Sequence, residues 1–469
     1  MSITQDRGGI KWAFGMALGA SGHATPAQAH ASEQGFVLLL PTDLYISAGT
    51  AVVALTILLL IAVPGGALAR LFRLVKLWRT RGAGARVTSL LSTCVLLWLI
   101  WVGTSGPRDP LSNPMPLAFW TVFWIGLVSV QGVVGDIWRW INPWSGMAAL
   151  IRQALGVRPV LHWPARWGRL PALVGFLAFA GFLLADPAPS DPARLARLVG
   201  LYWLSTLIAV LLFGPRWLIC GEAMTVLMRS YGRMGLLGRT GQRLALGLPG
   251  WQTARRGAPP LGAALFVLLL LGSGSFDGLN ETFWWLSVLG LNPLEFPGRS
   301  AIILQTLAGL AAVNLALIAG YGVSVWLGLR LTRGAVGFAV AFRALAPSML
   351  PIALGYHVAH YLPSFLVDIQ YAVAAATDPW ANGADWLGLG TFYVTTGFFN
   401  TQDTVRVIWL SQAAAVVLGH VLAVLLAHLM AARLFAVHRL AALSQAPLAL
   451  FMVGYTLFGL WLLASPRGM

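Results

Sequence analysis

Ten apolar runs, each long enough to cross a bilayer as a helix, constrain this chain more than any other feature. They lie at about 43–63, 87–105, 115–135, 170–186, 195–213, 260–276, 301–327, 345–368, 405–428 and 443–464. A hydrocarbon core of about 30 Å needs roughly 20 apolar residues in a helix, and a backbone inside lipid has to satisfy its own hydrogen bonds. The sequence therefore predicts an all-α, polytopic transmembrane helical bundle of about ten spans, with short interfacial helices.

The basic residues fall between these runs rather than on one soluble face. Of the 31 lysines and arginines, 23 lie in five alternate loops, at 64–86, 136–169, 214–258, 328–343 and 429–440, which hold only two acids. Loops rich in Arg and Lys stay in the cytoplasm, so both mature ends are predicted to lie outside it. The formal charge of +16 is thus a sign of membrane topology, and no nucleic-acid partner is expected. Two of these loops contain candidate in-plane helices, at 137–160 and 217–235.

The first residues are typical of a secretory signal. A basic start, a short apolar core and an Ala-x-Ala site predict a cleavable signal peptide at 1–29, followed by one integral membrane domain at 30–469. Cleavage after Ala29 would make His30 the new terminus, where its amine and ring nitrogen could chelate Cu(II). Cleavage after Ala31 would remove that histidine.

Histidines inside apolar runs are the first candidates for chemistry, because polar groups in hydrocarbon are expensive unless they have partners or a function. His357 and His360 stand at i, i+3 in the eighth run, Asp368 follows three helical turns after His357, and His420 lies in the ninth run. Three imidazoles and a carboxylate suit Zn, Mn, Fe or Cu. Histidine pairs could instead ligate a haem, or could simply form hydrogen bonds between helices.

A second polar group closes the sixth run. Asp277 and Glu281 stand at i, i+4 there, and they could join a site that opens outward. A solvated helix end followed by a turn is the alternative interpretation.

These segments resemble the bacterial integral membrane proteins of the fenitrothion hydrolase family. The matching residues are Asp136-Ile137-Trp138, Asn142-Pro143-Trp144, Gly221-Glu222-Ala223, Ser275-Phe276-Asp277-Gly278-Leu279, Glu281-Thr282, Pro351-Ile352-Ala353, Tyr356, Ala359-His360-Tyr361, Leu387-Gly388-Leu389-Gly390-Thr391, Gln412, Gly419-His420-Val421 and Leu426-Ala427-His428. The resemblance covers most of the mature chain. It implies an integral membrane protein of the bacterial inner membrane that hydrolyses organophosphate triesters, so the outside location predicted for both mature ends is the periplasm.

Together, these observations predict a membrane-embedded, metal-assisted hydrolase of a hydrophobic phosphotriester or similar ester. His357, His360 and His420 would be metal ligands, and Asp368 or Asp277 would be a fourth ligand or the general base. The expected partners are the lipid bilayer and a hydrophobic small molecule. Two rival hypotheses remain: a non-enzymatic protein that binds or transports a metal ion or small solute, and a haem-binding electron carrier.

Overall fold

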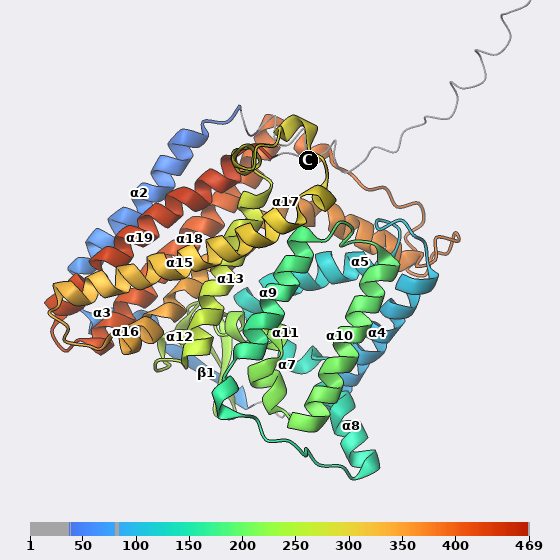
Figure 1. Ribbon diagram of the computed structural model, residues 1–469, viewed down its shortest axis with the longest axis horizontal. Coiled ribbons are helices and arrows are strands. Elements are labelled where there is room, and N and C mark those ends of the chain that lie inside the picture. The colour runs from blue at the N-terminus through green and yellow to red at the C-terminus, as the bar shows by residue number, and fades with distance from the viewer. Residues whose placement is uncertain (1–36, 38, 80–83, 468–469) are drawn as a thin grey trace, which may run out of the picture.

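Long apolar helices dominate the computed structural model, which describes residues 37, 39–79 and 84–467 (Figure 1). In these residues nine helical stretches are long and apolar enough to cross a membrane. They are α2 (Thr42–Ile61), α4 (Ala85–Ser105), the third stretch (Pro114–Val134), α10 (Pro192–Phe213), α13 (Leu261–Asn280), α15 (Ile303–Leu331), the stretch Phe338–Thr377, α18 (Gln402–Leu434) and α19 (His438–Ala464). The prediction of a polytopic helical bundle is confirmed. The predicted signal peptide and His30 lie outside the described residues.

One of the ten predicted spans, the fourth run at 170–186, is a shorter helix. α9 (Leu170–Ala185) has 16 residues, so it is about 24 Å long against a hydrocarbon core of about 30 Å. Two of the longer stretches are composite. The stretch Pro114–Val134 contains α5 (Pro114–Pro116), a π-helical segment η1 (Leu117–Leu127) and α6 (Val128–Val134). The stretch Phe338–Thr377 contains α16 (Phe338–Leu345), η6 (Ala346–Met349) and α17 (Leu350–Thr377).

Short elements connect the long helices at both ends of the bundle. They are α3 (Gly65–Leu71), α7 (Trp138–Ile141), α8 (Ser145–Leu155), η2 (Ala165–Trp167), η3 (Trp217–Gly221), α11 (Ala223–Tyr231), α12 (Trp251–Ala254), α14 (Phe283–Val288), η4 (Pro293–Glu295), η5 (Arg299–Ala301) and η7 (Gly397–Phe399). Three elements of the arginine-rich connections, α3, α8 and α12, lie toward the lower side of Figure 1, whereas the C-terminus lies toward its top. The alternation of basic loops in the sequence is thus an alternation between the two ends of the bundle.

A small antiparallel sheet joins two of these basic connections. Its strands β1 (Leu74–Arg79), β2 (Leu237–Thr240) and β3 (Arg243–Gly247) have the spatial order β1-β3-β2. Leu74 pairs with Gly247, and Leu237 pairs with Leu246. Hydrophobic periodicity does not predict these strands, because they are only four to six residues long and carry several cations.

The predicted in-plane helix at 217–235 is present as α11, but it does not lie on the rim of the bundle. Eight of its nine residues are buried, and it packs against α6, α9 and α17. Glu222 begins the helix and accepts hydrogen bonds from the backbone N–H groups of Met224 (2.7 Å) and Thr225 (2.6 Å). Burial raises the pKa of this carboxyl group above its usual value.

The helices α17 and α18, which contain the eighth and ninth apolar runs, pack against each other. α17 and α18 approach so closely that a Cβ atom on Gly419 would lie 2.5 Å from the carbonyl oxygen of Pro351. Gln412 on α18 donates a hydrogen bond of 2.8 Å to the carbonyl oxygen of Ala359 on α17. Small residues that allow such close contact are typical of helix pairs in membranes. α13 is the most enclosed of the nine long helices and packs against α17.

Candidate functional site

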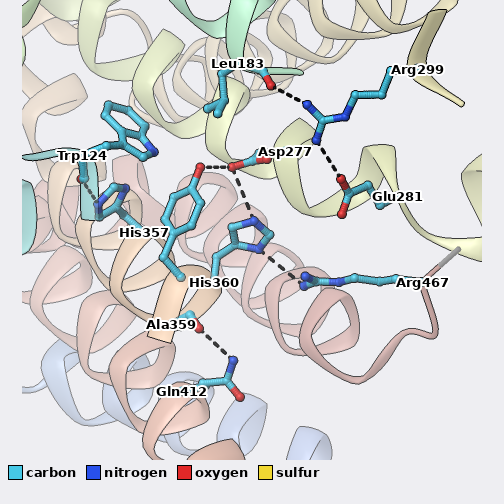
Figure 2. A network of polar contacts seen from close by, with 11 residues as sticks. Trp124, Leu183, Asp277, Glu281, Arg299, His357, Ala359, His360, Gln412 and Arg467 are labelled. Carbon is cyan, nitrogen blue, oxygen red and sulfur yellow. Dashed lines mark hydrogen bonds and ion pairs between the residues drawn. The ribbon is translucent and has the colours of Figure 1, made fainter. Parts of the chain in front are cut away.

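A buried polar cluster joins α13 to α17 near one end of the bundle (Figure 2). Asp277 on α13 accepts a hydrogen bond from the hydroxyl group of Tyr361, and its Oδ2 atom lies 3.4 Å from Nε2 of His360. The side chains of Asp277 and His360 are only 16% and 9% exposed. A carboxylate in such a place needs hydrogen-bond donors or a positive charge nearby, and both neighbours on α17 provide donors.

Arg467 completes the surroundings of His360. Its guanidinium group donates to Nδ1 of His360 at 3.4 Å. Because a guanidinium group can only donate, Nδ1 carries no proton, and the proton on Nε2 therefore points to Asp277. Arg467 is positioned by its backbone, which forms an antiparallel bridge to Thr282 beside α14. The cluster therefore combines residues from α13, α17 and the C-terminal segment.

His357 lies one helical turn before His360 and has a different partner. Its Nε2 atom lies 3.0 Å from the carbonyl oxygen of Trp124, and the two rings meet edge to face at 5.1 Å. Trp124 belongs to the π-helical segment η1, where the hydrogen-bond pattern differs from that of an α-helix, a feature frequent at functional sites. Since a carbonyl oxygen only accepts, Nε2 of His357 carries the proton. Its Nδ1 atom is therefore left with a basic lone pair.

These groups surround a small cavity of about 30 Å³, lined by Asp277, Tyr356, His357, His360 and Tyr361 together with Tyr231 and apolar side chains of α9. About 10–15 Å³ of such volume is enough to hold one water molecule. The cavity therefore has room for water, and a larger group could enter only if a lining side chain moved aside.

Tyr356 provides the cavity with an unused hydrogen-bonding group. Its hydroxyl group is buried and has no hydrogen-bond partner. The hydroxyl oxygen lies against Gly278 of α13, so closely that a Cβ atom there would overlap with it. The ring stacks on His360 with centroids 5.7 Å apart and 14° between the planes. A buried hydroxyl group without a partner is energetically unfavourable, and a ligand oxygen in the cavity would satisfy it.

The structure does not bring the five predicted site residues together. His357, His360 and Asp277 line the cavity, but His420 and Asp368 do not. His420 binds the carbonyl oxygen of Val416 through Nδ1 at 2.9 Å, and its buried Nε2 atom has no partner. Asp368, two turns beyond Tyr361 on α17, is half-buried and engaged in interactions of its own.

The predicted metal site is therefore not assembled. Among residues 37, 39–79 and 84–467, no group of three or more His, Cys, Asp or Glu side chains is arranged to hold a metal ion. His360 also has both ring nitrogens engaged, by Asp277 and Arg467. The donor set does not fit a bound metal, so no step proposed below runs through one.

The side chains of the predicted acidic pair, Asp277 and Glu281, lie in two different environments. Asp277 faces the cavity, whereas Glu281 pairs with Arg299 at 3.4 Å (Figure 2). Arg299 also donates a hydrogen bond of 3.0 Å to the carbonyl oxygen of Leu183 at the end of α9. This ion pair ties α9 to the end of α13 rather than contributing to the site.

Fold and site together define a multi-pass helical membrane protein with a buried polar cavity between α9, α13 and α17. No family model matches the chain, and comparison with curated proteins and with solved structures found no match either.

Proposed function

We propose that this protein is a membrane-embedded hydrolase of a hydrophobic ester. The resemblance to the fenitrothion hydrolase family favours an organophosphate triester as the substrate. The observation that carries the proposal is the water-sized cavity, which holds a histidine of fixed tautomer, a carboxylate and an unpartnered hydroxyl group. Hydrolysis needs a base for water and a donor for the oxygen that gains charge, and the cavity has both.

In the proposed reaction, a water molecule in the cavity attacks the phosphorus atom while Nδ1 of His357 takes its proton. The carbonyl group of Trp124 holds the ring in the tautomer that this step requires. The new P–O bond forms as the bond to the leaving oxygen breaks, and the proton on His357 then passes to that oxygen. Tyr356 donates a hydrogen bond to the phosphoryl oxygen.

The experiment compares His357→Gln with the wild type in detergent micelles, using a chromogenic dialkyl nitrophenyl phosphate. Glutamine can still donate to the carbonyl group of Trp124 but has no basic nitrogen, so the rate should fall by about 10²–10⁴-fold. His428→Gln is the matched control, because His428 lies near the C-terminal end of α18, does not line the cavity, and forms a hydrogen bond with the carbonyl oxygen of Val63. A His357→Gln variant with wild-type activity would refute the proposed base.

We also propose that the end of the bundle with the basic connections faces the cytoplasm of a bacterial cell, and that the chain ends in the periplasm. The support is the bias of Arg and Lys between the two ends. Reporter fusions within 235–255 should then report the cytoplasm, and fusions near 385 the periplasm. Opposite results at both positions would reverse this orientation.

A further inference from the structure

A second, far larger cavity lies beside the polar one. Its volume is about 790 Å³, and it lies between α4, η1, α9 and α10. In Figure 1, α4 and α10 stand on the right and α9 lies nearer the centre. Ligand pockets typically measure roughly 300–1,000 Å³, so this apolar chamber has the size of a small-molecule site. The polar cavity has about 30 Å³. The two spaces therefore suit different occupants, a hydrophobic molecule and water.

Apolar side chains make up most of the chamber wall, including Leu91, Leu99, Phe119, Phe123 and Leu195. Its few polar groups already have partners. Ser92 donates to the carbonyl oxygen of Thr88 at 3.0 Å, and Thr88 in turn donates to that of Trp140 at 2.5 Å. A bound molecule would therefore form no hydrogen bonds with the chamber, and the apolar wall favours a hydrocarbon group.

One side chain is common to both spaces. Phe179 of α9 lines the apolar chamber and also the polar cavity. Its ring lies 4.7 Å from that of Trp124, whose carbonyl group holds His357, and 6.0 Å from that of Trp120. The chamber and the cavity are thus neighbours, and the ring of Phe179 stands between them.

We propose that the apolar chamber receives an alkyl chain of the substrate from the bilayer, and that Phe179 swings aside to admit the ester group to the polar cavity. This inference rests on the proposed function and adds a substrate class to it: an ester with a flexible alkyl chain. Such a chain already resides in lipid, so it enters the chamber without crossing water. The ester is the only polar group of such a molecule. Tyr356, whose hydroxyl group has no partner, lines the polar cavity together with Phe179.

The test fills the chamber without touching the polar cavity. Ala178 on α9 lines the chamber but not the cavity, so Ala178→Trp places a large ring in the proposed chain site. The matched control is Val174→Trp, one turn earlier on the same helix. Val174 is 57% exposed and lines neither space. Both variants add an indole ring to the outside of one helix, so a general effect on folding would appear in both.

The readout is covalent labelling by a hexadecyl ester that carries a diazirine at its terminal carbon, mapped by mass spectrometry. In the wild type the label should fall on chamber residues of α4, α9 and α10. Ala178→Trp should reduce this labelling by about tenfold, and Val174→Trp should leave it unchanged. Equal labelling in both variants, or label confined to residues outside the chamber, would overturn the proposal. So would a copurified phospholipid that the probe does not displace from the chamber.

Labelling requires no turnover, so this proposal and the proposed hydrolase can fail separately. If Ala178→Trp loses the labelling and the wild type hydrolyses no ester, the chamber is a binding site for the alkyl chain but the proposed hydrolase reaction is wrong. If Ala178→Trp is not labelled by the probe but hydrolyses the hexadecyl ester at the wild-type rate, the reaction is supported and the proposed route through the chamber is wrong. The role of Phe179 is tested by a probe with its diazirine beside the ester. Phe179→Ala should increase labelling of Tyr231 and Tyr361 in the polar cavity, and no increase would exclude Phe179 as the gate.

Discussion

Replacing Gly278 by alanine tests the packing of the polar cavity directly. In most helices this change stabilises by up to about 1 kcal/mol, because glycine is a poor helix former. Here the new Cβ atom would overlap with the hydroxyl oxygen of Tyr356. Overpacking of this kind costs about 1–3 kcal/mol. The two effects together predict a protein that is less stable by up to about 2 kcal/mol.

A second substitution separates the two effects. Tyr356→Phe removes the overlapping oxygen, after which the nearest ring atom, Cζ, would lie 3.0 Å from the new Cβ atom, a distance that a small shift relieves. In this background Gly278→Ala should be neutral or stabilising, giving a coupling of about 1–3 kcal/mol in the double-mutant cycle. Gly274→Ala is the control on the same helix, because its Cβ atom would meet Tyr356 at an ordinary 3.8 Å.

The assay is thermal unfolding in detergent for all four members of the cycle and the control. Equal stability of Gly278→Ala and Gly274→Ala would refute the predicted overlap with Tyr356. The overlap would also be refuted if Tyr356→Phe did not restore the stability lost in Gly278→Ala. A rescue would show that the hydroxyl group of Tyr356 occupies the position described, against Gly278.

Two further predictions concern helix packing and pH. Gly419→Ala would place a Cβ atom 2.5 Å from the carbonyl oxygen of Pro351 and should lower the unfolding temperature, whereas Gly454→Ala, with open space around it, should not. Equal unfolding temperatures would contradict the close approach of α17 and α18. Burial raises the pKa of Glu222 above 4.5, so the protonated carboxyl group stabilises the folded protein fully below that pH and loses its effect as the pH rises through the raised value. The unfolding temperature of the wild type should therefore fall relative to that of Glu222→Gln from pH 4.5 upward, and parallel pH profiles would contradict this.

Helices and their pairing were predictable from the sequence because lipid leaves the backbone few alternatives. The part of the site on α17 was predictable for a related reason. His357 and His360 are conspicuous in an apolar run, and their nearest partners in space include their own helix neighbours Tyr356 and Tyr361. Position along a helix is enough to group such residues.

The remaining contacts depend on backbone geometry that side-chain patterns do not encode. The partner of His357 is the carbonyl group of Trp124, which lies in the π-helical segment η1. Arg467 reaches His360 only because the C-terminal segment folds back beside Thr282. For His420, the sequence predicted a contact with the histidines of α17 that the structure does not show. It lies on the helix next to His357 and His360, yet its ring faces Tyr455 of α19, with centroids 6.4 Å apart.

The burial of α11 has a consequence for the biogenesis of the protein. This helix has nine residues, about 14 Å in length, so it is too short to be inserted as a span by itself. One of its neighbours is α17, which the ribosome makes more than a hundred residues later, and Tyr231 of α11 lies 6.3 Å from His357 of that helix, ring to ring. The contact between α11 and α17 can therefore form only after α17 has been synthesised. Only then can Tyr231 close the polar cavity, so the site is assembled in one of the last steps of synthesis.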